Sequence, residues 1–110
     1  RLPTGRDSSN TAASREWNAL LYAEGVASNP TGNGYASNGF NKIRTAPLWL
    51  ARSGAVSDGS LNNAGSNSSY WSSTVGSIYN AFSLYFNSGN VFPATNGDRG
   101  RGYSVRCLVK

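Results

Sequence analysis

The sequence predicts an α+β fold in a single domain, and three observations support this. One segment, residues 14–24, places apolar residues at helical spacing. The last third of the chain alternates apolar and polar residues between turn residues, as an antiparallel meander does. Ser, Asn and Gly fill the remainder, with Gly at 13 of 110 residues, and they favour loops over long helices. We expect one or two helices, then a small antiparallel sheet with long loops.

The predicted helix runs from about Ser14 to Glu24. Ser14 is a suitable N-cap, Glu16 in the first turn complements the helix dipole, and Gly25 is a natural stop. We interpret Glu16 and Glu24, two turns apart, as exposed solubilising charges. The apolar residues at i, i+3 and i+4 spacing predict one buried face, formed by Trp17, Leu20, Leu21 and Tyr22.

The middle of the chain alternates between loop-like and apolar segments. Residues 26–41 are rich in Gly, Asn and Ser and are expected to form a long loop. The apolar tripeptide Leu48-Trp49-Leu50 is expected to be buried. Residues 57–69 are a turn-rich connection that leads into an aromatic strand, residues 70–74.

The C-terminal third carries the clearest strand pattern. Phe82, Leu84 and Phe86 share one face of a predicted strand, while Ser83 and Tyr85 point the other way. Residues 87–90 form a hairpin turn, and Val91 and Phe92 open a return strand that Pro93 stops. After a loop over residues 95–102, a final strand is predicted with Tyr103, Val105 and Cys107 on one face.

The residue types of this sequence give little support for catalysis. The chain has no His, which removes the commonest general base and metal ligand, and its five acids are spread without pairing. A carboxylate pair would require Asp58 and Asp98 to converge, which nothing in the sequence indicates. Cys107 lies among apolar residues and is interpreted as a buried structural thiol. We therefore expect neither enzymatic activity nor a cofactor or metal site.

The net charge of +5 raises the question of a nucleic-acid partner. The ten basic residues form no run or stripe, whereas nucleic-acid-binding surfaces usually cluster their positive charge. We expect no nucleic-acid partner. The charge is compatible with a surface protein that meets acidic partners or cell envelopes.

The sequence opens on Arg1-Leu2-Pro3-Thr4, with no initiator Met, signal peptide or hydrophobic anchor. We interpret residues 1–110 as one domain, the C-terminal part of a longer surface protein. Export or membrane attachment would then depend on segments upstream of this sequence, and we expect an extracellular or cell-surface location.

Two ordered sets of motifs carry a family resemblance across essentially the whole chain, most specifically over residues 65–109. The first is Arg1-Leu2-Pro3-Thr4 followed by Glu16-Trp17. The second comprises Tyr70-Trp71-Ser72-Ser73-Thr74, Asn80-Ala81-Phe82-Ser83-Leu84-Tyr85-Phe86, Asn90-Val91, Arg99 and Gly102-Tyr103-Ser104-Val105-Arg106-Cys107. In this order they resemble the bacterial major paralogous domain proteins of the Fibrobacter type. They are also similar to the variable proteins of diversity-generating retroelements.

The resemblance implies a C-type-lectin-like fold and assigns scaffold roles to several residues. Arg99 and Arg106 would hold loops through backbone carbonyls. Cys107 would pair with a cysteine that many relatives carry just before the first motif. The residues implied to fill the core are Trp71, Leu84, Phe86, Val91, Val105 and Cys107, and Tyr103 joins them in the scaffold.

The resemblance also implies that function resides between the scaffold positions. Tyr and Phe supply contact area there, and Ser and Asn supply adaptable hydrogen bonds. The competing interpretation makes Tyr79 and Phe92 ordinary core or strand residues. Calcium-dependent sugar binding is not expected, because paired acid and amide ligands are absent. The expected ligand-facing residues are Ile78, Tyr79, Asn80, Ser83, Tyr85, Asn87, Asn90, Phe92, Asn96, Asp98 and Arg101.

Retroelement diversification changes template adenines, and AAC-type codons altered in this way cannot encode Lys, Glu, Gln, Met or Trp. None of these five residue types occurs between Ser72 and Val109, which mildly favours diversification. The expected function is recognition of a protein or carbohydrate ligand on another cell or surface. The alternative is a structural or tip subunit of a bacterial pilus or fibre.

Overall fold

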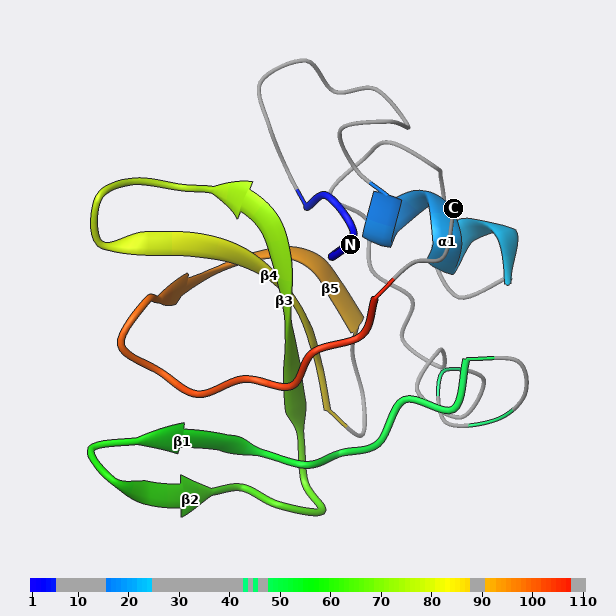
Figure 1. Cartoon of the computed structure of the whole chain (residues 1–110). Coiled ribbons are helices and arrows are strands. Elements are labelled where there is room, and N and C mark those ends of the chain that lie inside the picture. The colour runs from blue at the N-terminus through cyan, green and yellow to red at the C-terminus, as the bar shows by residue number, and fades with distance from the viewer. Residues whose placement is uncertain (6–15, 25–42, 44, 46–47, 88–90, 108–110) are drawn as a thin grey trace.

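The computed structural model of the chain describes residues 1–5, 16–24, 43, 45, 48–87 and 91–107. It is an α+β protein with a short helix and two antiparallel sheets, as predicted at that level (Figure 1). None of the helical segments within these residues is long and apolar enough to cross a membrane. The elements are α1 (Glu16–Ala23), β1 (Ala55–Ser57), β2 (Ser60–Asn62), β3 (Ser68–Val75), β4 (Asn80–Phe86) and β5 (Val91–Asp98).

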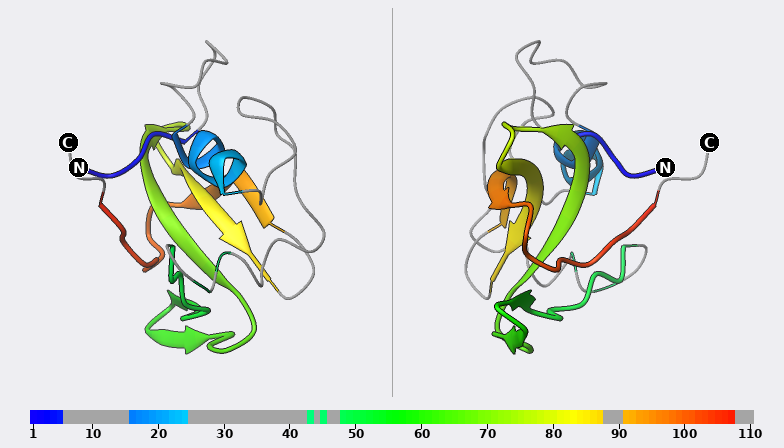
Figure 2. Two further views of the ribbon diagram at one scale, coloured as in Figure 1. Left: turned by 90° about the vertical axis from the view of Figure 1, so that its right-hand side faces the viewer. Right: turned by 60° about the vertical axis from the view of Figure 1, so that its left-hand side comes forward.

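The larger sheet is a meander in the order β3-β4-β5, with every neighbouring pair antiparallel. The predicted alternation in β4 is confirmed at Leu84 and Phe86, which are fully buried on one face. Residues 88–90 of the predicted hairpin turn lie outside the described residues. Figure 2 shows α1 beside this curved sheet, with the β1–β2 hairpin below both. The helix and the sheet therefore enclose the core between them.

Helix α1 begins at Glu16 because residues far upstream bind its first turn. The Thr4 hydroxyl accepts a hydrogen bond from Glu16 N at 3.0 Å, and Thr4 O accepts one from Trp17 N at 3.1 Å. In return, Thr4 N donates to Glu16 Oε2 at 2.8 Å. These two reciprocal hydrogen bonds are those of a capping box, formed here between residues that lie 12 apart in the sequence. The predicted cap Ser14 and stop Gly25 lie outside the described residues.

The core forms where α1 packs against one face of the β3-β4-β5 sheet. Trp17 meets Tyr70 edge to face at 6.2 Å between ring centroids, and Tyr70 stacks on Phe86 at 6.1 Å. Tyr22, expected on the buried face of the helix, is 48% exposed at its margin. The buried apolar residues are Trp17, Leu21, Ile43, Leu48, Leu50, Tyr70, Leu84, Phe86 and Val91.

Three further residues that were predicted to be buried are exposed. Trp49 is 66% exposed, because its positive φ of 52° turns the chain so that Leu48 and Leu50 point inward and the indole outward. Val105 is 58% exposed and the Cys107 thiol is also exposed. Their segment is not a strand: its main chain pairs with the sheets only through isolated bridges at Gly102 and Ser104, and Val105 and Cys107 both follow the last bridge.

The strand limits also differ from prediction. Pro93 does not stop the return strand, and residues 95–98, expected in a loop, belong to β5. β5 is an outer strand, and its register with β4 shifts between Ser83 and Tyr85, opposite Pro93. A residue without an N–H is tolerated at such an irregularity on a sheet edge.

The outer edge of β3 is covered by segments from both ends of the chain. Trp71 N donates to Ser104 O and Ser104 N donates to Ser69 O, each at 3.0 Å. Further along, β3 bulges between Trp71 and Val75, and there Ser73 N donates to Pro3 O at 2.9 Å. Main-chain groups that would otherwise form an open sheet edge are thus paired.

Candidate functional site

Three turns project from the same end of the molecule, on the left in Figure 1. They comprise residues 56–61, 75–80 and 98–102, and we call them the turn end. Arg99 N donates to Tyr79 O at 2.9 Å, which joins the second turn to the third. Val56 and Gly102 exchange two main-chain bonds of 2.8 Å, which join the third turn to the first. The three turns therefore form one connected surface.

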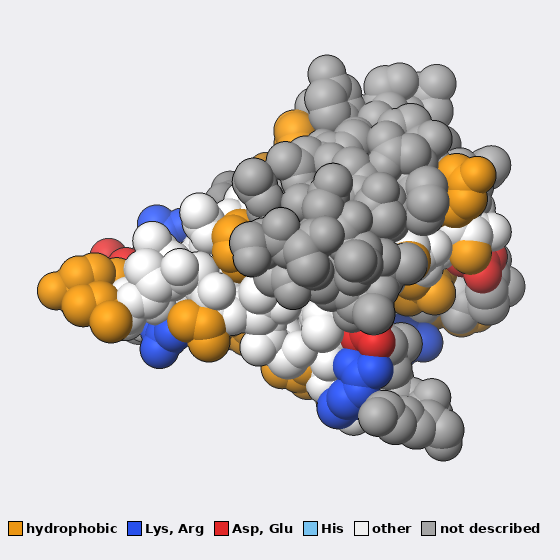
Figure 3. All heavy atoms as spheres, turned by 90° about the horizontal axis from the view of Figure 1, so that it is seen from above, with side chains coloured by type: hydrophobic (Ala, Val, Ile, Leu, Met, Phe, Trp, Pro, Cys, Tyr) orange, Lys and Arg blue, Asp and Glu red, His pale blue; other side chains and the backbone are white. Residues whose placement is uncertain are grey.

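The turn end exposes large apolar side chains. Ile78 is 78% exposed and Tyr79 72% exposed, at the tip of the β3–β4 connection. Viewed from above, hydrophobic side chains project at one pointed end of the molecule with acidic and basic groups beside them (Figure 3). The exposed apolar residues of the turn end are Val56, Leu61, Val75, Ile78 and Tyr79.

Local hydrogen bonds fix the turn that carries Ile78 and Tyr79. The Ser77 hydroxyl accepts from Tyr79 N and from Asn80 N, each at 3.1 Å. Asn80 O accepts from Gly76 N at 3.0 Å and from Ser77 N at 2.9 Å. Arg99 Nε also donates to Asn80 O at 3.3 Å, which confirms that this arginine holds a loop through a backbone carbonyl. The exposed side chains thus stand on an ordered main chain.

The third turn is ordered by its own aspartate. Asp98 Oδ1 accepts from Gly100 N at 2.9 Å, and Asp98 O accepts from Arg101 N at 3.1 Å. Asp98 and Arg101 are both exposed, as expected of ligand-facing residues. Asn96 is exposed beside the second turn, where its side chain lies close to Gly76.

The remaining predicted site residues lie elsewhere. Tyr85 and Phe92 stack at 5.9 Å between ring centroids, and Asn87 Nδ2 donates to the Tyr85 hydroxyl at 3.5 Å. These three form a second, half-buried group on β4, on β5 and at Asn87, directly after β4. Ser83 is only 1% exposed, and its hydroxyl donates to Thr95 O, so it lies inside the sheet rather than on the predicted ligand-facing surface. Asn90 lies outside the described residues.

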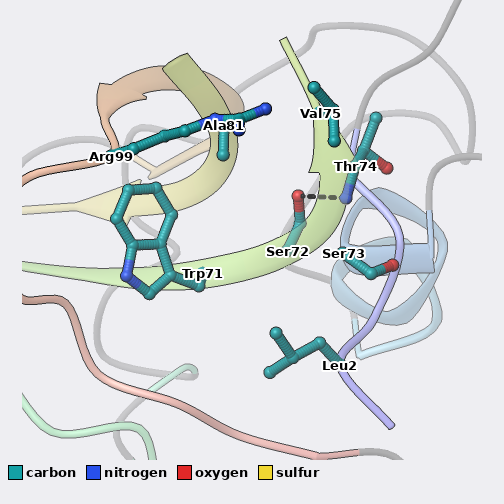
Figure 4. Close-up of a pocket in the computed structure, with 8 residues that line it drawn as sticks. All are labelled: Leu2, Trp71, Ser72, Ser73, Thr74, Val75, Ala81 and Arg99. Carbon is teal, nitrogen blue, oxygen red and sulfur yellow. Dashed lines mark hydrogen bonds between the residues drawn. The ribbon is translucent and has the colours of Figure 1, made fainter. Parts of the chain in front are cut away.

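A cavity of about 270 Å³, widely open to solvent, adjoins the turn end (Figure 4). It opens where β3 bulges away from β4, so the N-terminal segment and Arg99 complete its walls. Val75 and Arg99 belong to both the cavity and the turn end. Its lining residues are Leu2, Trp71, Ser72, Ser73, Thr74, Val75, Ala81 and Arg99.

Trp71 and Arg99 were assigned to the scaffold from the sequence, and in the structure both also line the cavity. Trp71 is half-buried, packing on Tyr103 at 4.2 Å between ring centroids while also lining the cavity. The other arginine with a predicted structural role, Arg106, donates to Leu48 O at 2.7 Å, as expected. Within the residues that the structure describes, no three acidic, His or Cys side chains are grouped to hold a metal.

Comparisons of the chain with models of protein families, with curated proteins and with solved structures gave no match.

Proposed function

We propose that this chain is a non-enzymatic recognition domain, displayed at a cell surface, that binds a protein or glycan ligand through the turn end. One observation carries the proposal: Ile78 and Tyr79 are 78% and 72% exposed on a main chain fixed by the hydrogen bonds of Ser77, Asn80 and Arg99. A main chain that is already fixed loses little entropy on binding, and large exposed side chains carried on it can act as the anchors that dominate interface energies.

The finer fold and family assignments belong to the same proposal. The motifs from Arg1 to Cys107 resemble those of Fibrobacter-type major paralogous domains and retroelement variable proteins with a C-type-lectin-like fold. Diversification of the turn-end residues is part of this proposal. Sequencing of the flanking DNA tests it: a near-identical repeat that differs at adenines, beside a reverse-transcriptase gene, is the expected result.

A retention assay tests ligand recognition directly. The full chain, fluorescently labelled, is applied to a glycan array and to intact bacterial and epithelial cells, with and without protease treatment of the cells. The double variant Ile78→Ser/Tyr79→Ser should lower retention at least about tenfold, because loss of two central anchors removes a large share of binding energy. Both side chains face solvent, so the variant should remain folded.

The matched control is Tyr22→Ser/Val105→Ser, which removes exposed apolar area outside the turn end. It should leave retention unchanged. Equal loss in both double variants, or no retention on any surface, would contradict the proposal.

The same exposed apolar residues would also suit packing between subunits, as in a pilus or fibre. Sedimentation at high protein concentration separates the two functions. A chain that remains monomeric favours recognition, whereas assembly that Ile78→Ser/Tyr79→Ser abolishes favours the fibre subunit.

A further inference from the structure

We propose that the cavity beside Trp71 receives the carboxyl-terminal residue of a protein ligand, with its apolar side chain inside and its carboxylate on Arg99. This inference rests on the proposed function, since it names the chemistry that the recognition domain would select. Val75 and Arg99 belong to both surfaces, so a ligand anchored in the cavity would continue onto Ile78 and Tyr79.

The interior of the cavity suits an apolar group. Leu2, Trp71, Val75 and Ala81 supply apolar walls. Its volume of about 270 Å³ lies just below the range of sites for drug-sized ligands, so it matches one residue rather than a long segment.

The hydroxyl groups of the lining are already engaged within the protein. Ser72 Oγ donates to Phe82 O at 2.7 Å and accepts from Thr74 N at 3.2 Å. Thr74 Oγ1 accepts from Gly5 N at 2.9 Å. A sugar, which presents several hydroxyl groups, would therefore find few free partners in this lining for the hydrogen bonds to water that it gives up.

Arg99 provides a fixed cation at the rim. Its Nε is anchored on Asn80 O at 3.3 Å, and Figure 4 shows its side chain extended past Trp71 toward Ala81. Among the described residues, its two terminal nitrogens have no hydrogen-bond or ion-pair partner. Terminal guanidinium nitrogens can bind both oxygens of a carboxylate end-on.

A chain terminus matches these features together. It carries a carboxylate and a side chain on the same carbon atom, as an apolar cavity with a single cation at its rim requires. An internal Asp or Glu would bring a carboxylate without an apolar side chain. The geometry therefore favours a terminal residue such as Leu over an acidic sugar or an acidic loop.

Calorimetry on the full chain tests the proposal with N-acetyl-L-leucine and N-acetyl-L-leucinamide. The acid should bind with a Kd of about 1 mM, and the amide at least about tenfold more weakly, because it lacks the charge that Arg99 recognises. The indole N–H resonance of Trp71 should shift with the acid. Equal affinity of acid and amide, no binding of the acid at about 10 mM, or tighter binding of N-acetylneuraminic acid would overturn the proposal.

Two variants locate the site. Arg99→Gln removes the charge, and Ala81→Leu fills the cavity while leaving Arg99 in place. Each variant should weaken binding of N-acetyl-L-leucine at least about tenfold. The control Arg52→Gln removes a positive charge outside both the cavity and the turn end, and it should change the affinity for the acid less than about twofold. Equal weakening of acid binding by Arg52→Gln would overturn the proposal.

If Arg99→Gln fails to fold, Ala81→Leu and the comparison of acid with amide still test whether the cavity binds a terminal carboxylate. The two proposals also fail separately. Cell retention that depends on Ile78 and Tyr79, without binding of the acid, would support the recognition function and contradict only the proposed role of the cavity.

Discussion

At the scale of single residues, Glu16 shows how much one side chain can connect. Its carboxylate forms an ion pair with Arg1 and accepts a hydrogen bond from Thr4 N, while its own N–H donates to the Thr4 hydroxyl. The sequence interpretation of Glu16 as a solubilising charge was therefore wrong. Helical periodicity could not reveal this role, because Arg1 and Thr4 precede the helix by more than ten residues.

These contacts make stability depend on pH. The hydrogen bond from Arg1, followed by the hydrogen bonds from Thr4, lowers the pKa of Glu16 from 4.5 to about 2. The unfolded chain binds the proton more readily, so the carboxylate contributes its full stabilisation above about pH 4.5 and loses it as the pH falls toward 2. Glu16→Gln should cost about 1 kcal/mol at pH 7, a discounted value because water screens a partly exposed pair.

Urea denaturation at pH 7, 4.5 and 2.5 measures this effect. The difference in unfolding free energy between the wild type and Glu16→Gln should narrow as the pH falls. Glu24→Gln, which removes a carboxylate at the other end of α1, serves as the control. A difference for Glu16→Gln that stays constant across these pH values would contradict the prediction.

At the scale of elements, a strand with regular alternation of apolar and polar residues could be predicted from the sequence. Elements that depend on turns and on irregular strands were missed. The strand Asn80–Phe86 was predictable because its apolar residues repeat every second position against a buried face. The β1–β2 hairpin, at the start of the predicted turn-rich connection, was not recognised from the sequence, since its strands have three residues each and β2 is wholly exposed. Its available signal was Asp58-Gly59, a dipeptide typical of two-residue hairpin turns.

Both residues of that turn have positive φ, 51° at Asp58 and 78° at Gly59, as a type I′ turn requires. A Cβ at Gly59 would meet no atom within 4 Å, so replacement costs only backbone strain. Gly59→Ala should therefore destabilise the protein by about 1 kcal/mol, and Gly59→Asn by less, because Asn tolerates this conformation. Thermal denaturation of the three proteins measures both, and an Asn variant less stable than the Ala variant would contradict the strain argument.

At the scale of the whole molecule, the parts of the site that sequence could not predict depend on contacts between distant segments. The exposure of Ile78 and Tyr79 was predictable because both lie between scaffold positions of a local hairpin. The cavity was not predictable, because it depends on a bulge in β3 against which the N-terminal segment packs. Ser73 in that bulge is hydrogen-bonded to Pro3, which lies 70 residues earlier in the sequence. Neither alternation nor turn signals encode such a contact.

The C-terminal segment closes the fold in the same long-range manner. Tyr103 packs on Trp71 of β3 and lies against Gly97 of β5, so a single ring bridges the two outer strands of the sheet. A Cβ at Gly97 would approach the Tyr103 ring to 2.6 Å and its hydroxyl to 2.8 Å. Because the same ring packs on Trp71, relief of the crowding requires the Tyr103 side chain to shift against Trp71.

Gly97→Ala should therefore destabilise the protein by about 1–3 kcal/mol, the usual cost of overpacking. The same change at Gly100, where the nearest atom would be Asp98 Oδ1 at 3.5 Å, should stay within about 0.5 kcal/mol. Guanidinium denaturation of both variants measures the difference. In a Tyr103→Ala background, Gly97→Ala should lose most of its cost, because the atoms that it displaces are gone. An unchanged cost there would show that the strain at Gly97 arises from the strand itself and not from closure of the sheet by Tyr103.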